Sequence, residues 1–111
     1  MPALVDEEHL IHLQMSRLCE SFPSLFNKPG VRPWNQKIFA QWASGPGATS
    51  GSRWAAAFVL GVWNGVSVGR DRWFGKRPYR VPEFDVVQAM GAWDHQHAAA
   101  FIAWCSKPFW P

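Results

Sequence analysis

The chain has little cysteine, few charged residues and no long uninterrupted apolar run. Its two cysteines, Cys19 and Cys105, are far apart and lack the CxxC spacing of zinc and redox sites. We therefore expect both to be reduced thiols in the core of a cytoplasmic protein. No stretch reaches the roughly 18 apolar residues of a membrane-spanning helix. The acidic first residues do not resemble a secretory signal peptide, so the sequence favours neither a membrane protein nor a disulfide-rich secreted domain.

Local signatures of catalysis are also lacking. No G-x-S-x-G or HExxH pattern occurs, and the glycine-rich residues 45–52 lack the lysine of a phosphate-binding loop, so we interpret them as a flexible connection. Asp94 is expected to cap a helix, with imidazoles at its polar start rather than around a metal ion. We therefore expect a chain that is not an enzyme and that has no catalytic residue, no metal and no cofactor. The four histidines are His9, His12, His95 and His97.

Tryptophan, by contrast, is abundant, with eight residues among 111. Apolar residues make up 48% of the chain and charged residues 17%, which is enough to bury a core within one domain spanning residues 1–111. A domain of this size has few fully buried sites, and these seldom hold tryptophan. Several indole rings should therefore be partly exposed, or should cover a surface that another chain completes. Tryptophan is also enriched at binding hot spots.

The apolar pattern predicts a mainly α-helical fold, a compact bundle of four to five short helices. Apolar residues recur at helical spacing in residues 6–22, 34–43, 53–63 and 95–106. Ser52 is a candidate cap for the third of these. A further helix is expected to open at Pro82, with Glu83 and Asp85 in its first turn. The stripes expected to face the core include Ile11, Met15, Leu18 and Phe22; Trp34, Ile38 and Trp42; Val87 and Met90; and Phe101, Ile102 and Cys105.

Residues 65–81 break this periodicity and are predicted to form one long loop or a small β-hairpin. Such long connections are usually functional or disordered, and the aromatic residues here argue against disorder. The stretch 70–80 carries five basic residues against one acid, so the basic character of the chain, net +3, is concentrated there. Cations interleaved with rings suit an acidic protein surface or a single-stranded nucleic acid.

The C-terminal residues 108–111 read Pro-Phe-Trp-Pro. Free, this apolar end would be a docking motif for a groove on a partner. Folded back, Phe109 and Trp110 would close the core, and we favour this arrangement because exposed apolar ends promote aggregation.

These features predict a small non-catalytic protein-interaction module, an adaptor or inhibitor, that docks on the acidic surface of a partner protein. The first alternative is a nucleic-acid-binding protein that uses the same basic and aromatic segment. The second is a self-associating structural subunit, in which excess indole surface closes a homodimer. No membrane is expected as a partner. The predicted partner-binding residues are Arg70, Arg72, Trp73, Phe74, Lys76, Arg77, Tyr79, Arg80 and Trp110.

Overall fold

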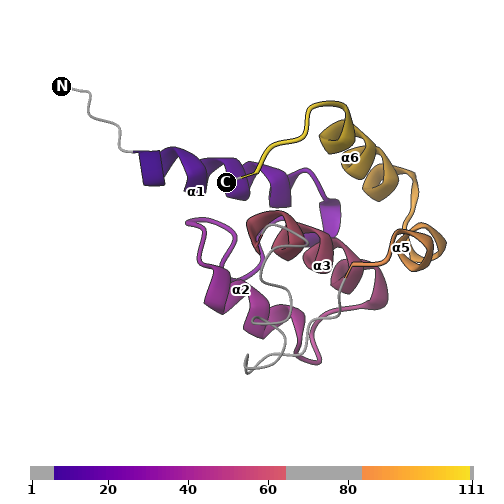
Figure 1. Cartoon of the computed structure of the whole chain (residues 1–111). Helices are drawn as coiled ribbons and strands as arrows, with labels where there is room; N and C mark the ends of the chain where they lie inside the picture. The colour runs from indigo at the N-terminus through magenta and orange to yellow at the C-terminus, as the bar shows by residue number, and fades with distance from the viewer. Residues whose placement is uncertain (1–6, 65–83, 111) are drawn as a thin grey trace.

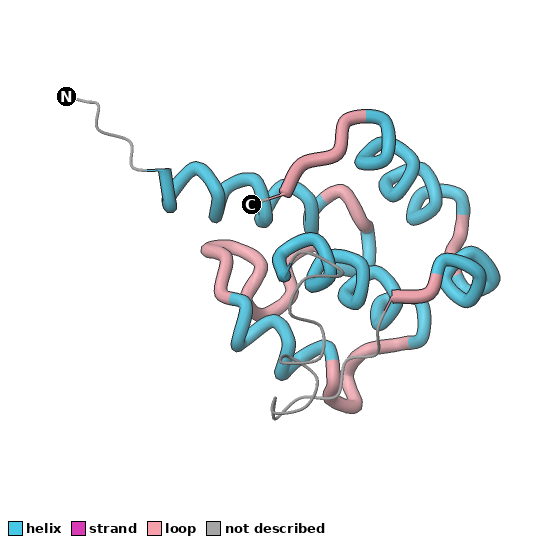
Figure 2. Tube along the Cα trace, viewed as in Figure 1, coloured by secondary structure: helices cyan, strands magenta, loops and turns pink. Residues whose placement is uncertain are grey.

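The computed structural model describes residues 7–64 and 84–110, which form a compact, mainly helical unit without strands (Figures 1 and 2). None of the described helices has the length and apolarity needed to cross a membrane. The predicted loop or hairpin at residues 65–81 lies outside the described residues and stays a prediction. The elements are α1 (Glu7–Glu20), the 3-10 helix η1 (Pro23–Leu25), α2 (Gln36–Ala43), α3 (Ser50–Asn64), α5 (Val86–Ala92) and α6 (His95–Ser106).

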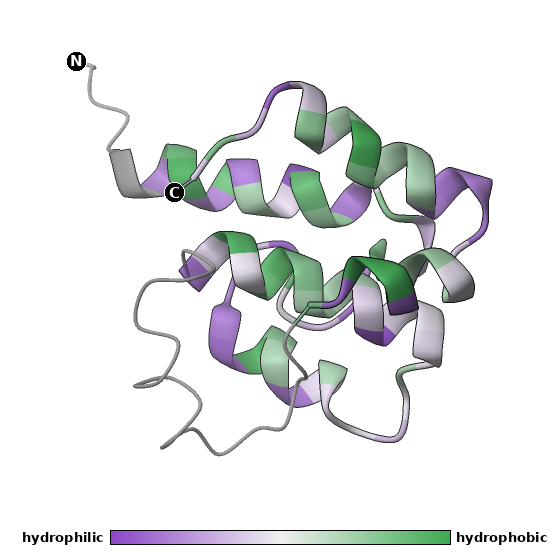
Figure 3. Cartoon of the chain, turned by 45° about the vertical axis from the view of Figure 1, so that its right-hand side comes forward, coloured by the Kyte–Doolittle hydropathy of each residue, from purple (hydrophilic) through white to green (hydrophobic). Residues whose placement is uncertain are grey.

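Helix α3 is the centre of the fold. It contacts α1, η1, α2 and α5, and it is buried almost without interruption from Ala55 to Val62. A helix that is apolar on all sides is stable in water only when other elements cover it. The three consecutive alanines at 55–57 give it a thin profile, so neighbouring elements approach its backbone closely. Figure 3 shows the apolar colour running along this helix beneath α1 and α6.

Two aromatic clusters fill the space around α3. The smaller one joins Trp34, which is buried, to Phe39 of α2 and to Trp63 at the end of α3. The larger one is centred on Phe58 of α3, whose ring meets others at centroid distances of 5.1 to 5.9 Å. The indoles of residues 42, 54, 63 and 104 are only partly buried, which confirms the expectation that several would be. The rings packed on Phe58 are Phe22, Phe84, Phe101 and Trp104.

The helix starts are set by local side-chain hydrogen bonds. Asp94 caps α6 as predicted, because its carboxylate accepts from the backbone N–H of His97 at 2.9 Å. Asp85 caps α5 instead of lying in its first turn, so that helix begins later than the sequence predicted. Ser52 is not the cap of α3. It lies inside the first turn and exchanges bonds with Thr49, whose hydroxyl accepts from the Ser52 N–H at 3.3 Å.

The start of α2 also differs from the sequence prediction. Asn35 accepts a hydrogen bond from the Ile38 N–H at 3.0 Å and so places the first helical residue at Gln36, after Trp34. Before it, Gly30 has φ +83°, and a Cβ at that position would collide with the backbone nitrogen of Phe39. Glycine is therefore required where this turn packs on α2.

On several helices, residues that were predicted to face the core are exposed. Met15, Leu18 and Phe22 are buried as expected, whereas Ile38 is exposed and Val87 is 77% exposed. On α6 the larger rings of Phe101 and Trp104 pack on Phe58. The stripe through Ile102 and Cys105 consequently faces solvent. The apolar residues left exposed in the described part of the chain are Leu10, Phe26, Ile38, Val86, Val87, Met90, Ile102 and Trp110.

Replacement of Phe22 by alanine should be strongly destabilising. Its fully buried ring contacts Phe58, Trp93 and His97, so the cavity should lower the free energy of unfolding by about 3–5 kcal/mol. The matched control, Ile102→Ala, removes an exposed side chain and should change stability by less than about 0.5 kcal/mol. Urea unfolding of the two variants gives the comparison, and equal effects would contradict the assigned core.

Candidate functional site

Of the predicted partner-binding residues, only Trp110 falls within the described residues. It is 56% exposed, and its ring meets that of Trp104 edge to face at 5.1 Å. Phe109 is partly buried against the core and also contacts Trp104. The C-terminal segment therefore folds back toward α1 (Figure 1), and Phe109 packs on the core as favoured from the sequence, whereas Trp110 does not close it. The other eight residues, from Arg70 to Arg80, lie outside the described residues.

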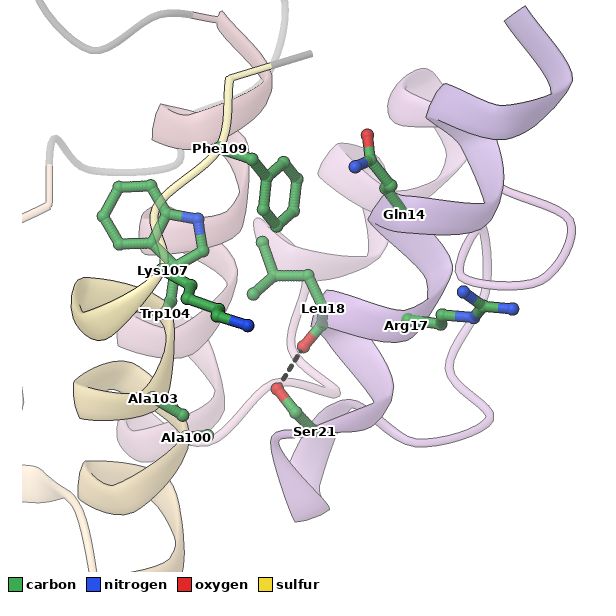
Figure 4. Close-up of a pocket in the computed structure, with 9 residues that line it drawn as sticks. All are labelled: Gln14, Arg17, Leu18, Ser21, Ala100, Ala103, Trp104, Lys107 and Phe109. Atoms are coloured by element: carbon green, nitrogen blue, oxygen red, sulfur yellow. Dashed lines mark hydrogen bonds between the residues drawn. The ribbon is translucent and has the colours of Figure 1, made fainter. Parts of the chain in front are cut away.

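A groove runs between α1 and α6 and is closed on one side by the C-terminal segment (Figure 4). It is open to solvent and has a volume of about 290 Å³. The two helices lie roughly antiparallel, because residue 14 faces residues 107 and 109 while residue 21 faces residue 100. Its apolar surface is much larger than its polar surface. The lining residues are Gln14, Arg17, Leu18, Ser21, Ala100, Ala103, Trp104, Lys107 and Phe109.

Each helix beside the groove contributes a basic residue, and in Figure 4 the Lys107 ammonium points into the groove while the Arg17 guanidinium points away from it. Arg17 on α1 and Lys107 at the end of α6 are exposed. The acid nearest to Arg17 is Glu20, whose carboxylate is already engaged by Arg32 at 2.7 and 2.9 Å. Within the described residues, neither Arg17 nor Lys107 makes an ion pair. The groove therefore combines an apolar floor with one cation that points into it, that of Lys107.

Trp104 contributes a buried donor that lacks an acceptor. Its indole Nε1–H has no hydrogen-bond partner among the described residues. In Figure 4 the nitrogen lies on the side of the ring that faces Phe109 and Leu18, toward the groove. A buried donor without an acceptor costs about 1–3 kcal/mol.

The inner end of the groove adjoins a chain of three polar side chains. Ser24 of η1 and His97 of α6 are joined by a 2.6 Å contact between the serine Oγ and the imidazole Nε2. The other ring nitrogen, Nδ1, lies 2.7 Å from Oδ1 of Asp94. The backbone N–H of Ser24 also donates to Nε2 at 3.3 Å. His97 is nearly buried, with 10% of its side chain exposed.

The positions of the protons among Ser24, His97 and Asp94 follow from the electrostatics of these side chains. The pKa of Asp94 lies below its ordinary value, chiefly because the backbone N–H of His97 donates to it and also because of the His97 ring. An ionised carboxylate only accepts, so Nδ1 carries the proton and donates it to Asp94. Nε2 is then an acceptor, which agrees with the backbone N–H that points at it. The Ser24 hydroxyl therefore donates to Nε2.

The cysteines divide between core and surface. Cys19 is fully buried as predicted, whereas Cys105 is exposed, which corrects the expectation that both belong to the core. Both are free thiols. No group of three or more His, Cys, Asp or Glu side chains within residues 7–64 and 84–110 has the geometry of a metal site.

The sequence analysis missed Ser24. Asp94 and His97 were singled out, because a capping acid three residues before an imidazole is a local pattern. Ser24 is 73 positions from His97, and no motif joins them. The residues that line the groove were likewise not predicted as a set, because their meeting depends on how α6 packs on α1.

Comparison with known proteins gives no match to a family model, to a curated protein or to a solved structure.

The two thiols should differ sharply in reactivity. Burial raises the pKa of Cys19 far above its ordinary value, and no reagent reaches a fully buried sulfur. In the native chain, one equivalent of thiol should react with an aromatic disulfide reagent, and mass mapping should locate it at Cys105. The second equivalent should appear only in denaturant. Rapid modification of Cys19 in the native chain would contradict its burial.

Stability should fall in acid. The pKa of Glu20 is lowered by hydrogen bonds from Arg32, and that of Asp94 by those from His97. Each carboxylate therefore stays ionised in the folded chain at a pH where the unfolded chain binds a proton, and stability is lost between about pH 5 and pH 1. The double variant Glu20→Gln, Asp94→Asn should show a flatter decline of the thermal midpoint. Parallel curves for the variant and the parent chain would contradict this assignment.

Proposed function

We propose that this protein is a small interaction module that binds an acidic, amphipathic segment of a partner protein in the groove between α1 and α6. The observation that supports this proposal is the combination of an open apolar groove with the Lys107 ammonium pointing into it and a second cation, Arg17, on the outer side of α1. An amphipathic helix or extended segment buries its apolar side chains in such a groove. Acidic residues beside those anchors meet the cations.

Each part of the groove has a separate role in this proposal. Leu18, Phe109 and the ring of Trp104 supply apolar surface, which dominates association because its burial removes contacts with water. The exposed cations contribute more to the association rate and to partner choice than to affinity.

Trp110 extends the proposed surface beyond the groove. Its ring packs on Trp104 but stays half exposed, which is typical of an aromatic anchor that completes its burial against a partner. The basic and aromatic residues 70–80 remain a second part of the proposed interface, on the evidence of the sequence alone. The same residues would serve the nucleic-acid alternative.

Charge reversal of the two cations beside the groove should weaken partner binding. The chain would be immobilised, exposed to nuclease-treated extract of its own cells, and the captured protein identified by mass. With that protein purified, Arg17→Glu plus Lys107→Glu should weaken binding by roughly tenfold or more, because like charges then face the acidic segment. Affinities are measured by calorimetry at two salt concentrations.

The matched control is Lys28→Glu plus Lys37→Glu, which makes the same change in net charge on the α2 side of the molecule. This control should bind like the parent chain. Equal losses for the two pairs would show a diffuse electrostatic effect and overturn the groove assignment. Loss of all captured material after nuclease treatment would favour nucleic acid, whose binding falls steeply with salt. A mass of two chains without a partner would favour the homodimer.

A further inference from the structure

We propose that Ser24, His97 and Asp94 form a nucleophilic site that hydrolyses small carboxylic esters with an apolar acyl group. This activity goes beyond partner binding and departs from the expectation of a non-catalytic chain. It rests on the two short contacts, 2.6 Å from Ser24 Oγ to His97 Nε2 and 2.7 Å from His97 Nδ1 to Asp94 Oδ1. A nucleophile, a base and a residue that orients the base are the parts that activated serines require.

The three side chains are held in fixed positions by the fold. Asp94 is fixed as the cap of α6, and the same Oδ1 atom accepts from both the backbone N–H and the ring of His97. The ring also lies against Phe22 and Trp93, which limits its rotation. Ser24 follows Pro23 in η1, where the proline fixes the backbone. Little reorganisation is therefore needed before reaction.

The proposed reaction is a two-step acyl transfer to water. His97 Nε2 takes the proton from Ser24 Oγ as the oxygen attacks the ester carbonyl carbon. The tetrahedral intermediate then collapses, the C–O bond to the alcohol breaks, and Nε2 returns the proton to the leaving oxygen. Water attacks the acyl-serine by the same route, and the carboxylic acid leaves while Ser24 regains its proton. No oxidant, reductant or metal enters the balance.

The backbone N–H of Ser24 is the donor available to the developing oxyanion. It points at Nε2 over a long 3.3 Å bond in the resting chain. When Nε2 takes up the serine proton it can no longer accept, so this N–H loses its partner at the moment when negative charge appears on the carbonyl oxygen. Once turned from Nε2 toward that oxygen, a donor of this kind would stabilise the transition state.

The surroundings favour a short acyl group. Ser24 is half-buried and His97 nearly buried, so a bulky group has no access to both. One helical turn away, Ser21 and Ala100 form the inner end of the apolar groove. An ester with a chain of a few carbons would reach Oγ and lay that chain along Ala100 and Leu18.

The test uses two probes on the intact chain. A fluorophosphonate should phosphonylate Ser24 with release of fluoride, and peptide mapping of the parent chain should locate the adduct there. 4-Nitrophenyl butyrate should be hydrolysed faster than in buffer. Ser24→Ala should lose both reactions. Ser106→Ala, which removes a hydroxyl of α6 that donates to the Ile102 carbonyl, should keep both.

Asp94→Asn separates catalysis from folding. Asparagine caps a helix as well as aspartate does, so Asp94→Asn should still fold and should lose only the part of the stability that comes from the ionised carboxylate. The ester turnover should fall on the order of 10²-fold, because the amide does not hold the ring in the required protonation state.

Three outcomes would overturn the proposal. They are an adduct mapped elsewhere or absent, turnover that survives Ser24→Ala, and turnover that Asp94→Asn leaves unchanged. If Ser24→Ala does not fold, the adduct position on the parent chain still decides. If the three residues stabilise the chain but the chain is inert to both probes, they serve only to hold α6 against η1.

Discussion

Burial of α3 is the constraint on which the rest of this structure depends. The helix has almost no polar side chain between Ala55 and Val62, so it cannot exist in water unless other elements cover every side. Its alanines add little volume of their own. The covering elements must therefore bring large side chains, and these are supplied by aromatic residues of α2 and α6 and of the segments that flank η1 and α5. A high tryptophan content in a small chain follows from a thin central helix as much as from function.

The contrast between a thin central helix and the large side chains that cover it explains which parts of the fold could be predicted from the sequence. Helix positions follow from local sequence patterns, and the structure confirms the cap that such a pattern predicted at Asp94. The buried faces do not follow, because they depend on which rings α3 accepts. Ile102 looked like core by spacing, yet Phe101 beside it has more apolar area and an edge-to-face partner in Phe58. Cys105 was turned outward by the same rotation.

The candidate sites could be predicted from the sequence even less completely than the buried faces of the helices. Asp94 and His97 are neighbours on one helix turn and could be found by reading the sequence, but Ser24 reaches them only through the packing of α6 against η1. The residues that line the groove likewise come from α1 and from α6 with the C-terminal segment, which are separated by most of the sequence. Trp110 was predicted as a binding residue from its residue type alone, and its role stays a prediction; the structure shows its ring half exposed on Trp104.

Asp94 connects α6, the hydrogen-bonded side chains of His97 and Ser24, and the groove. Its single Oδ1 atom fixes the first turn of α6 and the ring of His97 together, so the orientation of the imidazole is a consequence of where the helix begins. The contact of that ring with Ser24 then holds the start of α6 against η1. Because α6 is otherwise held by long side chains rather than by close backbone packing, this contact also fixes the inner end of the groove. A ligand that spreads α6 from α1 would therefore strain the Ser24–His97 contact, which couples the proposed binding surface to the proposed nucleophile.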